Sequence, residues 1–206
     1  MSSEFPNLGA FGFAASGSPP APESIYSPLS EFYADLGLPL PAIRILHPDH
    51  VPEPYRRLLV HDRDMTPTLE AAHRGKIHLR VLRYAADENI VSRLVALAME
   101  DETKVEVGAI RIFLHRLPHA ARQPILEHWK PFGSILQEHS VTHRCRPAAY
   151  FQVAADAMLA EALEVNSSES LYGRRNTIWN SHGEVLAEVV EILPPYPRVL
   201  NSGDKL

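Results

Sequence analysis

Residues 171–195 read LYGRRNTIWNSHGEVLAEVVEILPP. Two runs of alternating residues flank the turn signal Ser-His-Gly, and this pattern is typical of a β-hairpin. Alternate residues of a strand share a face, so positions 185, 187, 189, 191 and 193 lie together on the second arm. Glu191 is the one charged residue on that otherwise apolar face, and we expect it to point toward the core side of the sheet.

A buried carboxylate is costly unless it takes up a proton or finds partners. Glu191 therefore has two interpretations. It belongs to a ligand site, or it is a structural residue that forms an ion pair or reaches solvent at a sheet edge. The hairpin alone does not separate them.

Strand-like alternation recurs upstream of the hairpin, and segments with helical signals lie between the strands. Strands are predicted at 76–85, 90–99, 104–114 and 141–153, and helices at 54–60, 66–73, 117–129, 131–137 and after Asp156. Hairpin-joined strands with intervening helices predict an α+β fold, an antiparallel sheet with helices packed on one face. Residues 1–28, rich in Ser, Pro, Ala and Gly, indicate a disordered or loosely docked tail, and 29–200 a single domain.

Two arginines also occupy strand faces that are otherwise apolar. Arg93 shares its face with positions 91, 95, 97 and 99, and Arg111 shares its face with 105, 107, 109 and 113. A guanidinium keeps its proton, so a buried arginine needs an anion or several acceptors. If these faces line one cavity, Arg93, Arg111 and Glu191 form a small-molecule site. The alternative is that Arg93 and Glu191 pair with each other.

Backbone donors at two predicted helix starts could add to such a site. The stretches Met65-Thr66-Pro67 and Pro131-Phe132-Gly133 each precede or open a helix, where free N–H groups favour anions. Histidines at 115 and 119, and at 139 and 143, are four residues apart, but no HExxH motif or Cys-His cluster accompanies them. The sequence therefore predicts neither a metal site nor a cofactor.

Composition limits the class of protein. The chain has 206 residues, 45% of them hydrophobic, which is enough for one sizeable core. A net charge of −5 argues against a nucleic-acid partner. No apolar run is long enough for a membrane span, no secretory signal is evident, and the single Cys145 fits a reducing compartment. We therefore expect a cytoplasmic protein without nucleic-acid or membrane partners; its oligomeric state stays open.

Four short blocks, in this order, resemble the chorismate pyruvate-lyase family, the 4-hydroxybenzoate synthases, including its uncharacterised branch. They are Asp64-Met65-Thr66 with Leu69-Glu70, the Arg93 strand with the Gly108 strand, Pro131-Phe132-Gly133, and 171–175 leading to Glu191 and Leu193-Pro194. The resemblance covers about residues 54–195. It implies an antiparallel sheet with a ligand under helical flaps, and a lyase that removes pyruvate from chorismate without a cofactor, giving 4-hydroxybenzoate.

The resemblance also implies roles for individual residues. Arg93 matches the arginine that holds the ring carboxylate, and Glu191 matches the glutamate at the ring hydroxyl, so both are expected in catalysis. Met65 and Phe132 match positions whose backbone amides bind substrate, although a smaller apolar residue is familiar at the second. Arg111 is kept as a further substrate contact, and Glu188 is the alternative to Glu191. The alternative function is a non-catalytic domain of the same fold that binds or senses an aromatic acid.

Overall fold

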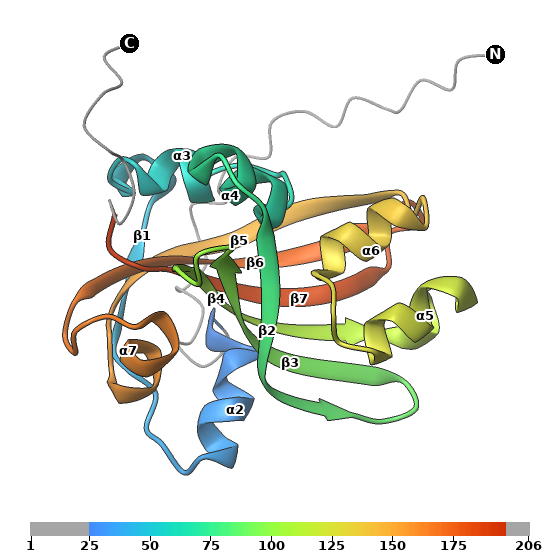
Figure 1. The fold of residues 1–206 in the computed structure, drawn as a ribbon, viewed down its shortest axis with the longest axis horizontal. Coiled ribbons are helices and arrows are strands. Elements are labelled where there is room, and N and C mark those ends of the chain that lie inside the picture. Colours follow the sequence, from blue (N-terminus) through green and yellow to red (C-terminus); the bar gives the residue numbers. More distant parts are fainter. Residues whose placement is uncertain (1–24, 197–206) are drawn as a thin grey trace, which may run out of the picture.

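The computed structural model describes residues 25–196. Seven strands form one sheet in the order β1-β5-β6-β7-β4-β3-β2, and every neighbouring pair is antiparallel (Figure 1). The strands are β1 Ile43–Leu46, β2 Ile77–Ala86, β3 Ile90–Met99, β4 Lys104–Phe113, β5 His143–Ala154, β6 Ser170–Asn180 and β7 Val185–Leu193. The predicted hairpin of residues 171–195 is confirmed as β6 and β7, at the centre of the sheet.

The turn of this hairpin is set by local chemistry. Gly183 has a φ of 80°, a left-handed conformation that costs glycine little. The side-chain oxygen of Asn180 accepts hydrogen bonds from the backbone N–H groups of His182 and Glu184, both at 2.9 Å. The turn fixes a register in which Arg174 lies opposite Glu191.

Helices cover both faces of the sheet. They are α2 Leu29–Asp35, α3 Tyr55–Leu59, α4 Met65–His73, α5 His119–Leu126, α6 Phe132–Glu138 and α7 Ala157–Leu163, with 3-10 turns at Pro48–His50 and Leu114–Arg116. Helices α3 to α6 pack on the face that carries Arg93 and Glu191, called here the site face. Helices α2 and α7 pack on the opposite, rear face, which carries Leu94 and Val190. The α+β antiparallel fold is thus confirmed, with the rear helices as an additional layer.

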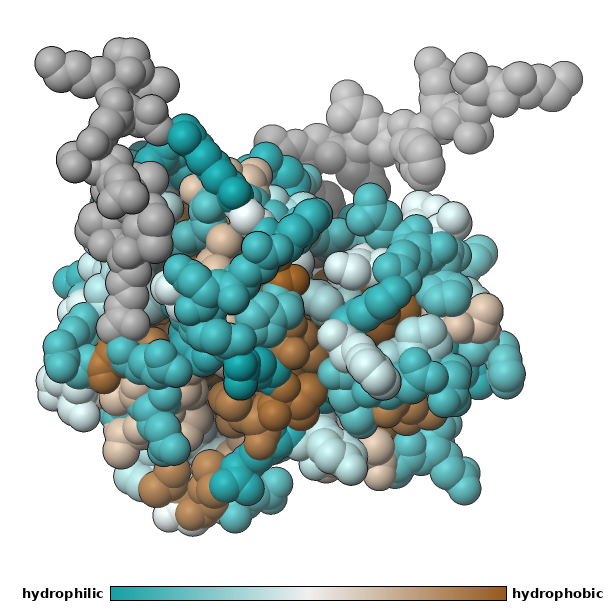
Figure 2. Space-filling model, in the orientation of Figure 1, coloured by the Kyte–Doolittle hydropathy of each residue, from teal (hydrophilic) through white to brown (hydrophobic). Residues whose placement is uncertain are grey.

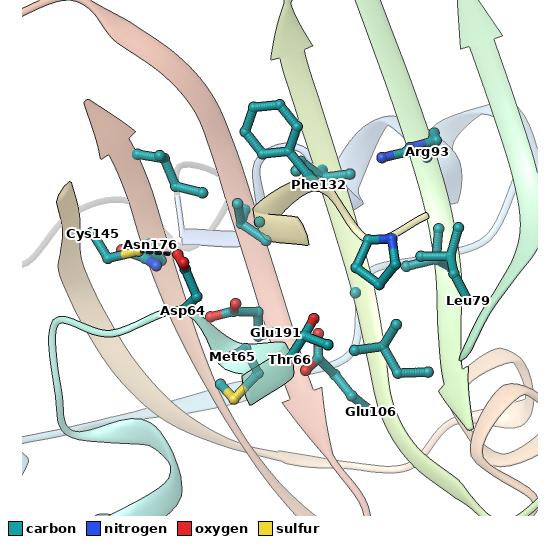
Figure 3. Close-up of a pocket in the computed structure, with 18 residues that line it drawn as sticks. Asp64, Met65, Thr66, Leu79, Arg93, Glu106, Phe132, Cys145, Asn176 and Glu191 are labelled. Atoms are coloured by element: carbon teal, nitrogen blue, oxygen red, sulfur yellow. Dashed lines mark hydrogen bonds between the residues drawn. The ribbon is translucent and has the colours of Figure 1, made fainter. Parts of the chain in front are cut away.

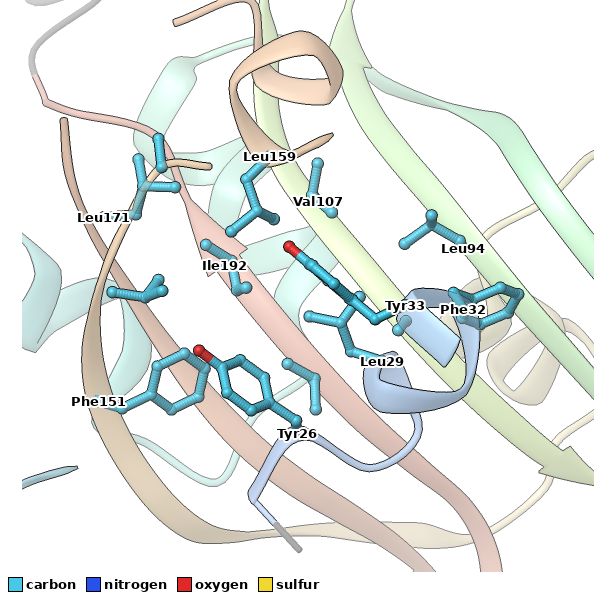
Figure 4. Packing of buried hydrophobic residues seen from close by; sticks show 14 of the residues in the cluster. Tyr26, Leu29, Phe32, Tyr33, Leu94, Val107, Phe151, Leu159, Leu171 and Ile192 are labelled. Atoms are coloured by element: carbon cyan, nitrogen blue, oxygen red, sulfur yellow. The ribbon is translucent and has the colours of Figure 1, made fainter. Parts of the chain in front are cut away.

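The rear core contains a segment that sequence patterns did not place. Leu29, Phe32 and Tyr33 of α2 are buried against the sheet (Figure 4). Ile25 and Tyr26 belong to the same core, each only 1% exposed, so the described domain begins earlier than the predicted boundary at residue 29. Residues 1–24 of the predicted tail lie outside the described residues.

Asp156 connects the two rear helices. As predicted, it caps α7: its carboxylate accepts a hydrogen bond from the Leu159 N–H at 2.9 Å. Its other oxygen accepts one from the Tyr33 hydroxyl of α2 at 2.7 Å.

Hydrophilic side chains cover most of the surface seen in Figure 2, apart from an apolar patch near its centre. Within residues 25–196, no helix is both long and apolar enough to cross a membrane.

Candidate functional site

A cavity lies on the site face, between the central strands and the first turns of α4 and α6 (Figure 3). Its volume is about 70 Å³, several times what a single water needs. Its walls are mainly apolar, formed by Leu79, Val95, Leu97, Ile110, Ile178 and Val189. The polar groups that reach it are few, which is the usual character of a small-molecule site.

Arg93 lines this cavity from β3 and is 0% exposed. None of its three side-chain nitrogens has a hydrogen-bond partner within the described chain. Burial lowers the pKa of Arg93 to about 10, so the guanidinium is still charged at neutral pH. The inward orientation expected from strand alternation is observed, and no group within residues 25–196 compensates this buried cation.

Glu191 reaches the same cavity from β7 and is 6% exposed, but its partner is Arg174 rather than Arg93. The Arg174 Nε group donates a hydrogen bond to the Glu191 carboxylate. Arg174 is 0% exposed and also donates to the backbone carbonyls of Leu59 at 3.1 Å, His61 at 2.9 Å and Arg63 at 3.2 Å. One guanidinium therefore fastens the segment between α3 and α4 to the cavity floor.

Glu106 is a further ionisable residue at the cavity, and sequence reasoning missed it. It lies on β4, is 4% exposed, and its Oε2 atom has no hydrogen-bond partner among residues 25–196. Burial raises the pKa of Glu106 well above its ordinary value, and the negative charge of Glu191 raises it further. Both effects favour the protonated, neutral form of Glu106. In the sequence, Glu106 could have been recognised as a site residue because strand alternation places it on the same face as Gly108 and Ile110.

The two predicted sources of backbone donors also border the cavity. Met65 is the first residue of α4 and Phe132 the first of α6, and both are almost fully buried. The structure thus brings Arg93, Glu191, Met65 and Phe132 together. That their backbone N–H groups bind a ligand stays a prediction.

A hydrogen-bonded cluster fastens α4 to β5 beside the cavity. The Asp64 carboxylate accepts hydrogen bonds from His143 Nε2 at 3.0 Å and from the Cys145 thiol at 3.3 Å. The other ring nitrogen of His143 lies 2.9 Å from the Val141 carbonyl, so both nitrogens face acceptors, as suits a protonated ring. A Cβ added at Gly133 would lie 3.3 Å from the Asp64 side chain, so α6 packs closely here.

The cluster shifts the pKa of each member. The hydrogen bond to Asp64 raises the pKa of His143. Burial alone would raise the pKa of Asp64, but the hydrogen bond and charge of His143 outweigh it, and the net shift is downward. Burial and the Asp64 carboxylate raise the pKa of Cys145 to about 12, so the thiol is protonated and a poor nucleophile.

Arg111 does not belong to the cavity, and its placement there is corrected. It lies opposite Ser92 in the ladder, so its side chain points to the rear face. There it forms ion pairs with Glu188, at 2.9 Å, and with Glu31 of α2. Glu188 also binds Arg175 on the rear face, at 2.8 Å, and is thereby set aside as the alternative to Glu191. The apolar faces of Arg93 and Arg111 lie on opposite sides of the sheet, and helices cover both.

No group of three His, Cys, Asp or Glu side chains suited to a metal occurs in the described part of the chain.

No protein-family model matches the chain, and no curated protein sequence matches it. Solved structures do match. PhnF from Mycobacterium smegmatis is similar over 71% of this chain and 72% of its own, with 10% identity and a TM-score of 0.54. The effector domain of PhnF from Mycobacterium smegmatis covers 63% of this chain and 87% of its own, with 11% identity and a TM-score of 0.52. The ligand-binding domain of a putative GntR-family transcriptional regulator from Bordetella bronchiseptica covers 62% and 92%, with 15% identity and a TM-score of 0.46.

These similarities show the fold, which is the chorismate-lyase-like α+β fold that the resemblance implied. They contradict the prediction that the chain is an enzyme, a carbon–oxygen lyase, because the matching domain of PhnF is described as an effector domain. The blocks that carried the resemblance place charged groups and helix starts around a cavity, an arrangement that does not by itself require catalysis. Catalytic roles for Arg93 and Glu191 are therefore withdrawn.

Proposed function

We propose that this domain binds a small aromatic monocarboxylate in the site-face cavity and does not transform it. One observation carries the proposal: Arg93 is fully buried, charged and without a hydrogen-bond partner in the described chain, and it lines an apolar cavity. An uncompensated buried charge costs several kcal/mol. A carboxylate in the cavity would offset that cost, because arginine binds carboxylates through two parallel hydrogen bonds.

The ladder geometry favours a ligand about one ring long. Arg93 and Glu191 lie on the same face with β4 between their strands, and the register offsets them by two residues. With strands about 4.8 Å apart and a rise of about 3.4 Å per residue, their Cα atoms are roughly 12 Å apart. The two side chains fill much of that distance, and the remaining space is bounded by apolar walls.

The regulator structures support sensing rather than catalysis. The effector domain of PhnF shares this fold, and an effector domain needs a ligand site but no reaction. In this chain, Glu191 is already bound by Arg174, so its carboxylate serves as a fixed hydrogen-bond acceptor. Chorismate incubated with the protein should accordingly be recovered unchanged.

A thermal-shift comparison of benzoate with benzamide tests the proposal. The two molecules have nearly the same shape, but only benzoate carries the charge that Arg93 needs. A ligand present at 100 times its Kd stabilises by about 2.7 kcal/mol, which raises the Tm of a protein this size by about 5 °C or more. We expect this shift with benzoate or a ring-substituted benzoate, and none with the amides. Equal effects of acids and amides, or no effect of any acid, would contradict the proposal.

A further inference from the structure

We infer that Glu106 determines which ligands the cavity accepts, by donating a hydrogen bond from a neutral carboxyl group to an uncharged oxygen of the ligand. The ligand class is thereby narrowed to monocarboxylates that carry a hydroxyl or carbonyl group at the end opposite the carboxylate. Acids with a second carboxylate at that end are rejected. This inference rests on the proposed function, because it requires the carboxylate to be at Arg93.

The position of Glu106 fits the far end of such a ligand. Arg93 lies opposite Ile110 on β4, and Glu106 is four residues further along the same strand face. Four residues correspond to about 13 Å along the strand, so the two groups lie at opposite ends of the cavity (Figure 3). Gly108 lies between them without a side chain, and a Cβ there would come within 3.0 Å of Glu106 Oε1. The Glu106 carboxyl group therefore lies over Gly108, in the space that a side chain at this position would take.

The charges around Glu106 explain why it keeps its proton. Glu191 on β7 and Arg174 on β6 act on it electrostatically, and Asp64 at the start of α4 also lines the cavity. The region thus has two buried glutamates and one guanidinium, which is bound to Glu191 and three backbone carbonyls. Two adjacent carboxylates that share one cation do not both ionise readily in a dry site, and the unpaired one is protonated. The raised pKa of Glu106 agrees with this arrangement.

This pair of acids presents one donor and one acceptor to the cavity. Neutral Glu106 donates through its carboxyl hydrogen, and Glu191, which is paired with Arg174, accepts. A ligand hydroxyl can satisfy both, and a ligand carbonyl can satisfy Glu106 alone. A second ligand carboxylate would lie beside the Glu191 charge, and the described residues that line this end of the cavity offer it no free cation. A buried donor left without an acceptor lowers affinity, which is how such a group discriminates between ligands.

Calorimetric titration with four probes tests the inference at pH 6: benzoate, 4-hydroxybenzoate, 4-formylbenzoate and terephthalate. The wild type should bind the hydroxy and formyl acids about tenfold more tightly than benzoate, which corresponds to one good hydrogen bond, and terephthalate more weakly than benzoate. Glu106→Gln keeps a donor and should retain the preference for the formyl acid. Glu106→Leu removes the donor and should lose that preference.

The pH dependence provides a second readout. In the wild type, the preference for 4-formylbenzoate should decline as pH rises and Glu106 loses its proton, whereas in Glu106→Gln it should be constant. If benzoate binds through Arg93 but the preference is absent, or survives in Glu106→Leu, the inference is overturned while the proposed function stands. If none of the four acids binds, both are overturned.

Discussion

Glu191 accepts its hydrogen bond from Arg174, and Arg93 is left without an anion from any described residue. The two buried arginines thus differ in kind. Arg174 is part of the fold, because it ties the hairpin to the α3–α4 segment. Arg93 has no structural partner in residues 25–196, although it is fully buried. That difference is the basis of the ligand-binding proposal, and it can be measured in the free protein.

Replacing Arg93 by methionine should stabilise the ligand-free protein. The change removes an uncompensated buried charge and keeps most of the side-chain volume, so we expect a gain of about 1–3 kcal/mol in the free energy of unfolding, measured by urea denaturation. Arg111→Met is the matched control; it breaks partly exposed ion pairs on the rear face and should change stability by about 1 kcal/mol or less, as a loss. Destabilisation by Arg93→Met would mean that Arg93 has a structural partner.

Replacing Arg174 by methionine should have the opposite effect. Glu191 and three backbone carbonyls would lose their donor in a buried site, which costs about 3–5 kcal/mol. The neighbouring Arg175→Met, whose guanidinium binds Glu188 on the rear face, serves as the control and should cost much less. Similar losses for both variants, in the same denaturation experiment, would argue against a special role for Arg174.

Sequence alternation predicted the sheet well because each strand places its side chains on two different faces. The hairpin, the inward direction of Arg93 and Glu191, and the Asp156 cap were all confirmed. Alternation cannot tell which side of the sheet a face belongs to when helices cover both sides, and Arg111 was misplaced for that reason.

Other features depended on information that local patterns lack. The Arg174–Glu191 bond requires the hairpin register, which the turn geometry sets. Simple alternation places Lys104 on the face of Glu106, which makes that face look solvent-exposed. In the structure a register shift sets Lys104 opposite Ala98, on the other face, where it forms an ion pair with Glu164. Helix α2 and strand β1 are only seven and four residues long, and Pro39 and Pro41 lie between them, so neither the helical nor the strand periodicity can be recognised in this region.

The stability of the wild type should fall with rising pH because of Glu106. Its pKa is raised in the folded protein, so the folded state holds a proton that the unfolded state releases above the ordinary glutamate value of 4.5. Stability is therefore highest below that pH and declines until the folded pKa is passed. Glu106→Gln should remove this part of the decline and be more stable than the wild type at pH 8, as measured by urea denaturation. Parallel curves for the two proteins would show that Glu106 is not held neutral.

The Asp64–His143 pair should stabilise the protein in a limited pH window. The lowered pKa of Asp64 gives stabilisation that is present above the ordinary value of 3.8 and lost as pH falls through the folded value. The raised pKa of His143 gives stabilisation that is present below 6.5 and lost as pH rises through its folded value. Asp64→Asn should therefore cost about 1–2 kcal/mol near pH 5 and less at pH 9. The exposed Asp62→Asn is the control; a pH-independent loss in Asp64→Asn would contradict this account.

Calorimetric titration of benzoate and 4-hydroxybenzoate into the wild type and Arg93→Met tests the central claim most directly. Loss of one partner of a buried, hydrogen-bonded charge pair costs about 2–5 kcal/mol, so the Kd of the tighter-binding acid should rise by at least about 30-fold in Arg93→Met. Because the variant should be at least as stable as the wild type, the loss cannot be attributed to unfolding. Equal affinities of the two proteins for these acids would contradict the claim that Arg93 binds the carboxylate.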